Sequence, residues 1–137
     1  MPGAPVLDSH ALLAFFRGEP AGVQVKALLQ KAAAADRPLG LTEVNYAEVK
    51  YVLLKKDGEG AWARAADVLK SLPLEFHPVN RALANTAADY KARFKISLAD
   101  AFAAALAKER KAELVTGDPE FKPLEKEVKI RSRGSPL

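Results

Sequence analysis

Two hydrophobic patterns alternate along the chain: short apolar runs and longer segments with helical spacing. The short runs are rich in Val, Leu and Ile and stop near proline, glycine or a polar residue, which is typical of buried strands. They predict a sheet of four to five strands, at residues 5–9, 38–43, 73–79 and 112–117, with 127–132 as the optional fifth.

Between these runs the apolar residues recur every three or four positions, as they do on one face of a helix. This spacing predicts helices at residues 10–18, 22–37, 45–58, 60–72, 79–94 and 97–112. The predicted inner faces include Val23 and Val25 in the second helix and Leu98 in the last. Strands that alternate with helices indicate an α/β fold of three layers (α/β/α), in which helices cover both faces of a central, mostly parallel sheet.

The composition fits one compact domain over residues 1–137, with 132–137 as a flexible tail. The 137 residues are 49% hydrophobic and 28% charged, as in globular proteins. No long apolar run or secretory signal is present, so we expect a cytoplasmic protein that does not contact a membrane. The absence of cysteine excludes thiolate chemistry. The net charge of +4 permits weak attraction to nucleic acid phosphates, although a solvated surface explains the same charge better.

Four carboxylates stand where predicted strands end or helices begin. Asp8 and Asp118 end strands, whereas Glu48 and Asp100 lie in the first turns of helices. Each also has a structural explanation, because an acid at a helix start bonds the free backbone N–H groups. A parallel sheet, however, sends the ends of neighbouring strands to one edge, where ligands bind. We therefore expect several of these acids to lie together.

Such a cluster needs a positive charge. Two carboxylates about 5 Å apart repel by about 3 kcal/mol at an effective dielectric constant near 20, whereas a helix cap contributes about 1 kcal/mol. Capping alone does not explain the cluster, but a cation among the acids does. Hard oxygen ligands, no cysteine and only two histidines favour Mg²⁺ or Mn²⁺ over Zn²⁺. We expect Asp118 to bind this metal and also to cap its helix.

The same segments resemble PIN-domain ribonucleases, in particular the VapC-type toxins of bacterial and archaeal toxin–antitoxin pairs. VLDSHALLAFF resembles the first strand of the family, which carries the first acid, and NYAEVKYVL resembles the segment that carries the second acid. ISLADAFAAALAKE resembles the helix that carries the third acid, and ELVTGDPEF resembles the closing strand and turn. By this resemblance the catalytic and metal-binding residues are Asp8, Glu48, Asp100 and Asp118. Thr116 matches a hydroxyl that is often found beside the last acid.

The resemblance implies Mg²⁺- or Mn²⁺-dependent hydrolysis of RNA phosphodiester bonds, which leaves a 5′-phosphate and a 3′-hydroxyl. A metal-activated water would attack, so no side-chain nucleophile is required. It also implies a homodimer that is inhibited by a small antitoxin protein. The competing hypothesis is a catalytically silent PIN-like module for interaction or oligomerisation, which the presence of all four acids disfavours. A phosphatase or phosphotransfer domain is disfavoured as well, because Asp8 is followed by Ser9 and His10 rather than by a second acid.

Several residues near the four acids have open or structural interpretations. Ser9 fits a hydrogen bond to a metal-binding carboxylate and a helix cap equally well. Asn45 is expected to cap its helix, and His10 and His77 are expected to lie outside the chemistry. Glu43 and Glu120 are further acids whose roles stay open; Glu120 stands where relatives often have another acid, so it is a candidate to share the last ligand position.

Overall fold

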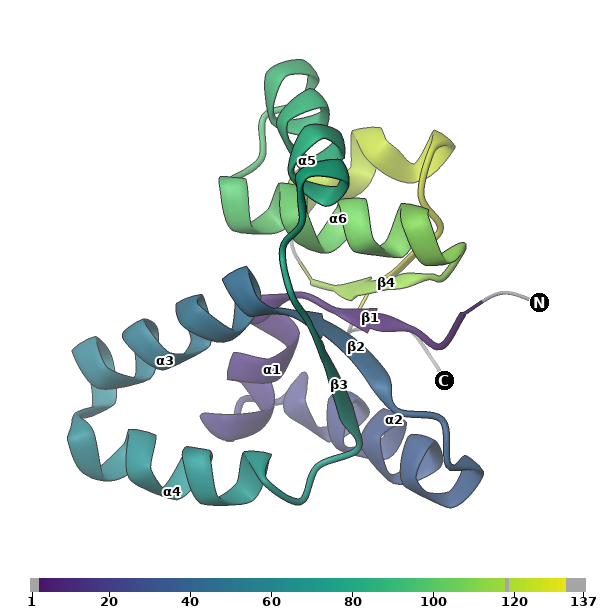
Figure 1. Cartoon of the computed structure of the whole chain (residues 1–137). Coiled ribbons are helices and arrows are strands. Elements are labelled where there is room, and N and C mark those ends of the chain that lie inside the picture. The colour runs from purple at the N-terminus through teal and green to yellow at the C-terminus, as the bar shows by residue number, and fades with distance from the viewer. Residues whose placement is uncertain (1–2, 118, 133–137) are drawn as a thin grey trace.

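The computed structural model describes residues 3–117 and 119–132 (Figure 1). In this part of the chain the strands are β1 (Val6–Leu7), β2 (Leu39–Thr42), β3 (Leu74–His77), β4 (Leu114–Thr116) and β5 (Ile130–Ser132). The helices are α1 (Ser9–Phe16), α2 (Gly22–Ala35), α3 (Glu43–Asp57), α4 (Glu59–Leu69), α5 (Arg81–Arg93), α6 (Leu98–Arg110) and the 3-10 helix η1 (Pro119–Lys126). Asp118 and residues 133–137 of the predicted tail lie outside the described residues.

The strands form one parallel sheet in the order β3-β2-β1-β4-β5. The central strand β1 pairs with β2 on one side and β4 on the other, with Val6 opposite both Gly40 and Leu114. Helical crossovers connect the parallel strands, as parallel pairing requires. The predicted three-layer α/β/α fold with a parallel central sheet is confirmed. No helix of the described residues has the length and hydropathy needed to cross a membrane.

A separate hydrophobic core lies on each face of the sheet. Helices α5, α6 and η1 cover one face, where Val6 and Leu114 pack. Helices α1 to α4 cover the other face, where Leu7 and Val115 pack. Successive side chains of a strand point to opposite faces of the sheet. Val6 and Leu7 of β1 therefore belong to different cores, and so do Leu114 and Val115 of β4. The apolar character of the central strands follows from this burial on both sides.

Two predicted core positions are wrong. Val23 is 72% exposed and Leu98 is 54% exposed. The buried face of α2 is formed by Val25, Leu28, Leu29 and Ala32. Val23 precedes Val25 by two positions, or about 200° around a helix, so the two side chains cannot share this face. Leu98 is the first residue of α6, and the buried face of this helix begins later, at Asp100.

Polar side chains begin the helices near the carboxyl edge of the sheet. Asp8 Oδ1 accepts a hydrogen bond of 2.8 Å from the backbone N–H of Ala11 and so caps α1. Ser97 caps α6 in the same way. The cap of α3 is Thr42 rather than Asn45, because this helix begins at Glu43, two residues earlier than predicted. The side chain of Asn45 is therefore available for other contacts.

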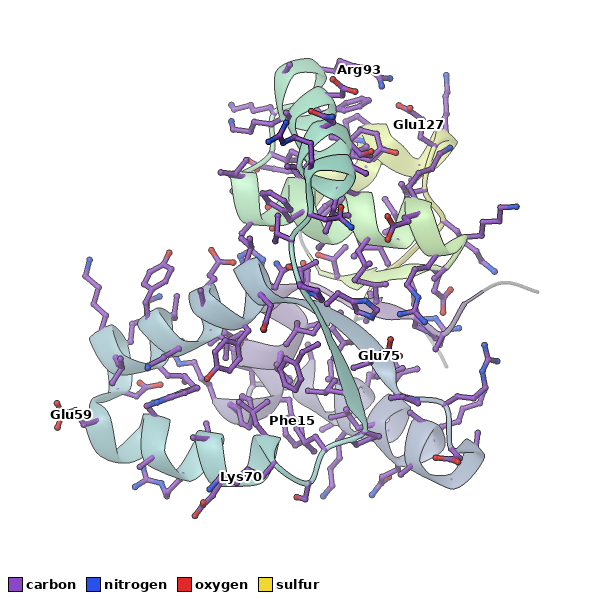
Figure 2. All side chains as sticks on the ribbon, in the orientation of Figure 1. Phe15, Glu59, Lys70, Glu75, Arg93 and Glu127 are labelled. Carbon is purple, nitrogen blue, oxygen red and sulfur yellow. The ribbon has the colours of Figure 1, made fainter. Side chains whose placement is uncertain are left out.

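An ion pair connects α5 to the segment after η1. Figure 2 shows Arg93 and Glu127 near the end of the molecule that is opposite to α4. The guanidinium of Arg93 forms two hydrogen bonds with the Glu127 carboxylate, of 3.1 and 2.5 Å. The ion pair thus links the end of α5 to the C-terminal part of the chain, and Arg93 also lies over the ring of its neighbour Phe94.

Candidate functional site

Two of the predicted acids are buried together at the carboxyl edge of the sheet. Asp8 directly follows β1, and its backbone N–H donates to the carbonyl of Val115. Asp100 lies in the first turn of α6. The two residues are only 0% and 1% exposed, respectively. Because buried carboxylates are rare unless they are paired or bind a metal, their joint burial marks this edge as the candidate site.

His10 completes a compact group with these acids. Asp8, His10 and Asp100 each offer one ligand atom, and the three atoms lie within 4.8 Å of one another. His10 Nδ1 is 3.6 Å from Asp8 Oδ2 and 3.8 Å from Asp100 Oδ1. His10 is a half-buried histidine at the start of the first helix, as expected, and the structure adds that it lies against both acids. The signal was present in the sequence, because an N-cap at Asp8 puts His10 in the first turn of the same helix.

The surrounding carboxylates make His10 a cation. Its pKa is raised to about 9, chiefly by the interaction with Asp8; burial of the ring opposes this shift, and the charges of Asp8, Asp100 and Glu48 add to it. At neutral pH the imidazolium thus offsets part of the negative charge of the group. The electrostatics of the site favour a cation at this position.

Two carboxylate oxygens of the site are buried without a hydrogen bond. Among the described residues, Asp8 Oδ2 and Glu48 Oε1 have no hydrogen-bond partner. Buried carboxylate oxygens normally accept hydrogen bonds, so such atoms suit a ligand cation. Both are hard oxygen donors, which fits Mg²⁺ or Mn²⁺. Glu48 is not part of the compact group, but its charge acts on His10.

The other predicted residues differ in where they lie. Ser9 is buried and accepts a hydrogen bond from Asn45. Thr116 is buried at the carboxyl end of β4, next to the central strand. Glu120 is exposed in η1, and Glu43 is exposed in the first turn of α3. The structure thus brings Asp8 and Asp100 together with His10 and leaves Asp118 undescribed.

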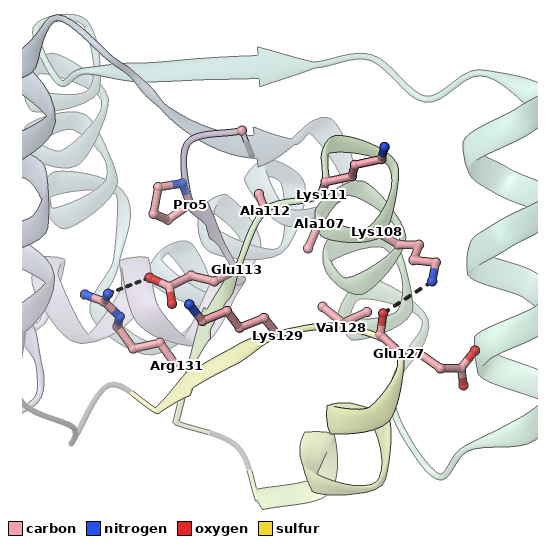
Figure 3. A pocket seen from close by; sticks show the side chains of 11 residues that line it. Pro5, Ala107, Lys108, Lys111, Ala112, Glu113, Glu127, Val128, Lys129 and Arg131 are labelled. Atoms are coloured by element: carbon pink, nitrogen blue, oxygen red, sulfur yellow. Dashed lines mark hydrogen bonds and ion pairs between the residues drawn. The ribbon is translucent and has the colours of Figure 1, made fainter. Parts of the chain in front are cut away.

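A cleft of about 540 Å³ lies at the opposite edge of the sheet (Figure 3). Residues before β1, β4 and β5 line it, among them Pro5, Glu113 and Lys129. Arg131 and Glu113 form an ion pair of 2.7 Å across it. None of the predicted site residues contributes to this cleft, so it is separate from the acids.

Comparison with known proteins agrees with the fold. No curated protein matches the chain in sequence. The VapBC2 structure from Rickettsia felis, bound to a promoter DNA fragment, matches with a TM-score of 0.76 and 16% identity, over 94% of this chain and 98% of that one. VapC20 from Mycobacterium tuberculosis, a toxin that cleaves the sarcin-ricin loop, matches with a TM-score of 0.69 and 18% identity, over 87% of this chain and 93% of that one.

A third structure, FitAcB from Neisseria gonorrhoeae, matches with a TM-score of 0.71 and 18% identity, over 94% of this chain and 97% of that one. At these identities the structural likeness establishes the fold alone. A model of the PIN domain family matches the sequence itself over residues 6–127, which include Asp8, Glu48, Asp100 and Asp118. The chain therefore belongs to the PIN domain family.

Proposed function

We propose that this protein is a metal-dependent endoribonuclease and the toxin of a type II toxin–antitoxin pair. The observation that carries the proposal is the buried group of Asp8 and Asp100 at the carboxyl edge of a PIN-domain sheet, with ligand atoms within 4.8 Å of one another and of His10. Two buried acids at this separation, one with an oxygen that lacks a hydrogen bond, suit a divalent cation.

The residues have separate roles in this proposal. Asp8 and Asp100 hold Mg²⁺ or Mn²⁺, Glu48 adds a third carboxylate from α3, and Asp118 is the fourth acid. The chemistry that a bound divalent ion supplies is polarisation of the scissile phosphate and a lower pKa of an attacking water molecule. Because water is the nucleophile, the protein side chains only have to bind, orient and neutralise charge.

Three further residues support this site. Ser9 lies beside Asp8 and holds it through the contact with Asn45. Thr116 ends the strand that leads to Asp118, and Glu120 is a second acid shortly after it. We propose that Thr116 and Glu120 act near the last acid.

The proposed partners are RNA, a small antitoxin protein and a second copy of the chain, in the cytoplasm. Support comes from the structural neighbours, which include VapBC complexes and a toxin that cleaves the sarcin-ricin loop. The net charge of +4 is compatible with an RNA substrate.

The test is cleavage of a labelled mixed-sequence RNA with Mg²⁺, Mn²⁺ or EDTA. The wild type is compared with Asp8→Asn and Asp100→Asn, and Asp67→Asn is the matched control because the Asp67 side chain is 83% exposed on α4. Asparagine is as good a helix cap as aspartate, so Asp8→Asn keeps the start of α1. We expect metal-dependent cleavage with 5′-phosphate products by the wild type and the control, and background cleavage by the other two variants.

Mn²⁺ binding to the wild type is measured in parallel, because a narrow RNA target would hide the activity. Cleavage that persists in EDTA, or equally in Asp8→Asn, would contradict the proposal. Folded wild type that neither cleaves RNA nor binds Mn²⁺ would instead support the silent interaction module.

A further inference from the structure

Asn45 is completely buried, and its side chain bonds three different segments of the chain. Its Nδ2 donates to Ser9 Oγ at 2.9 Å and to the carbonyl oxygen of Ala99 at 3.1 Å. Its Oδ1 accepts a hydrogen bond from the hydroxyl of Thr42. Both N–H donors and the carbonyl oxygen of the amide therefore have partners within the protein.

The partners of this amide are the sequence neighbours of the acids. Ser9 directly follows Asp8, and Ala99 directly precedes Asp100. Asn45 itself lies on α3, one turn before Glu48. Ser9 and Ala99 are 36 and 54 positions from Asn45, respectively. One side chain thus joins the first turns of α1, α3 and α6. Asp8 and Asp100 stand at two of these helix starts, and Glu48 lies in the second turn of α3.

Only a carboxamide satisfies these contacts. It provides two N–H donors and one carbonyl acceptor, whereas a carboxylate provides no donor and a hydroxyl only one. An aspartate at position 45 would face the carbonyl of Ala99 with a second acceptor and would add a further negative charge. An apolar residue would remove this partner from the partly buried Ala99 carbonyl and the buried Thr42 hydroxyl, which is unfavourable.

The acids need such a connection because His10 offsets only part of their mutual repulsion when no metal ion is bound. Asp8 and Asp100 come from segments that are far apart in the sequence, and both are buried. We infer that Asn45 is a positioning residue that holds the segments of Asp8, Glu48 and Asp100 in the arrangement that binds the metal. This inference rests on the proposed metal centre. Asn45 acts through the carboxylates and has no direct role as a ligand.

The test measures Mn²⁺ affinity, by electron paramagnetic resonance of the free ion, in wild type and Asn45→Ala. Residues that orient metal ligands typically change affinity by about 10- to 100-fold, and we expect a loss in this range. The matched control is Leu69→Ala, a core truncation in α4 that destabilises the fold without touching the acids. Its Mn²⁺ affinity should equal that of the wild type, although its melting temperature falls.

Ser9→Ala is the second variant, for the case that Asn45→Ala does not fold. It removes only one partner of the amide, and we expect a smaller loss of affinity in the same direction. Wild-type affinity in a folded Asn45→Ala or Ser9→Ala, or an equal loss in Leu69→Ala, would overturn the positioning role and leave the metal centre intact. A wild type that binds no Mn²⁺ would instead overturn the proposed function, and the positioning role with it.

Discussion

The guanidinium of Arg110 donates a hydrogen bond to Nε2 of His77 and so joins the last turn of α6 to the edge strand β3. Glu75 lies beside both groups, 3.5 Å from Arg110 Nη1 and 3.4 Å from His77 Nε2. Because a guanidinium has only donors, Nε2 must accept, and the imidazole in this contact is neutral. The helix and the edge strand are thus held together by a histidine that must stay unprotonated.

This contact should weaken in acid. Burial of the ring, and then the charge of Arg110, lower the pKa of His77 below its ordinary value, although Glu75 opposes the shift. Between the folded pKa and the unfolded value of about 6.5, the unfolded state binds more protons, so stability is lost as the pH falls through this window. We expect the wild type to lose free energy of unfolding relative to His77→Gln between pH 7 and pH 5, measured by urea denaturation. Parallel pH curves for the two proteins would contradict this.

Metal binding should appear as thermal stabilisation that depends on Asp8. At a Mg²⁺ or Mn²⁺ concentration of 100 times the dissociation constant, the folded state gains about 2.7 kcal/mol. Calorimetry should show this gain in wild type and its absence in Asp8→Asn, which retains the cap to Ala11. An equal metal-dependent shift in Asp8→Asn and wild type would exclude Asp8 as a ligand.

The capping role of Asp8 is tested separately, without metal. In EDTA, Asp8→Ala should be less stable than Asp8→Asn by about 1 kcal/mol, because alanine cannot cap α1.

The close approach of α1 and α2 requires glycine at position 22. A Cβ atom at Gly22 would overlap the carbonyl oxygen of Ala14. Gly22→Ala should therefore lower the free energy of unfolding by about 1–3 kcal/mol, as overpacking typically does. The control is Gly60→Ala in α4, where the nearest atom is Arg64 Nη1 at 3.4 Å and alanine should stabilise by about 0.5 kcal/mol. Equal stability of the two variants in chemical denaturation would refute the packing argument.

The short helix η1 should contribute substantially to stability. Phe121 and Leu124 are completely buried and belong to the core beneath α6. Leu124→Ala should cost about 2–5 kcal/mol in unfolding free energy, as core truncations do. Lys122→Ala, at an exposed position of the same helix, should change it by less than about 0.5 kcal/mol. A cost for Leu124→Ala as small as that for Lys122→Ala would mean that η1 is only loosely attached to the core.

The local pattern of the sequence was enough to predict the elements. All five predicted strands and six predicted α-helices are present, because apolar periodicity reports directly which face of a segment is buried. A helix after Asp118 was predicted from the capping pattern alone and without bounds; in the structure it is the 3-10 helix η1. Its prolines, Pro119 and Pro123, and the three-residue spacing of Phe121 and Leu124 suit a 3-10 helix and give no α-helical pattern.

The sequence by itself also determined which acids were candidates. Asp8 and Asp100 stand at the starts of α1 and α6, and Glu48 lies in the second turn of α3, and a parallel sheet directs the starts of such helices to one edge. Only the tertiary structure decided that the order β3-β2-β1-β4-β5 brings Asp8 and Asp100 together, that His10 lies between them, and that Asn45 bonds their neighbours. The reason is physical: periodicity records burial one segment at a time, whereas contacts among buried polar groups depend on which segments meet.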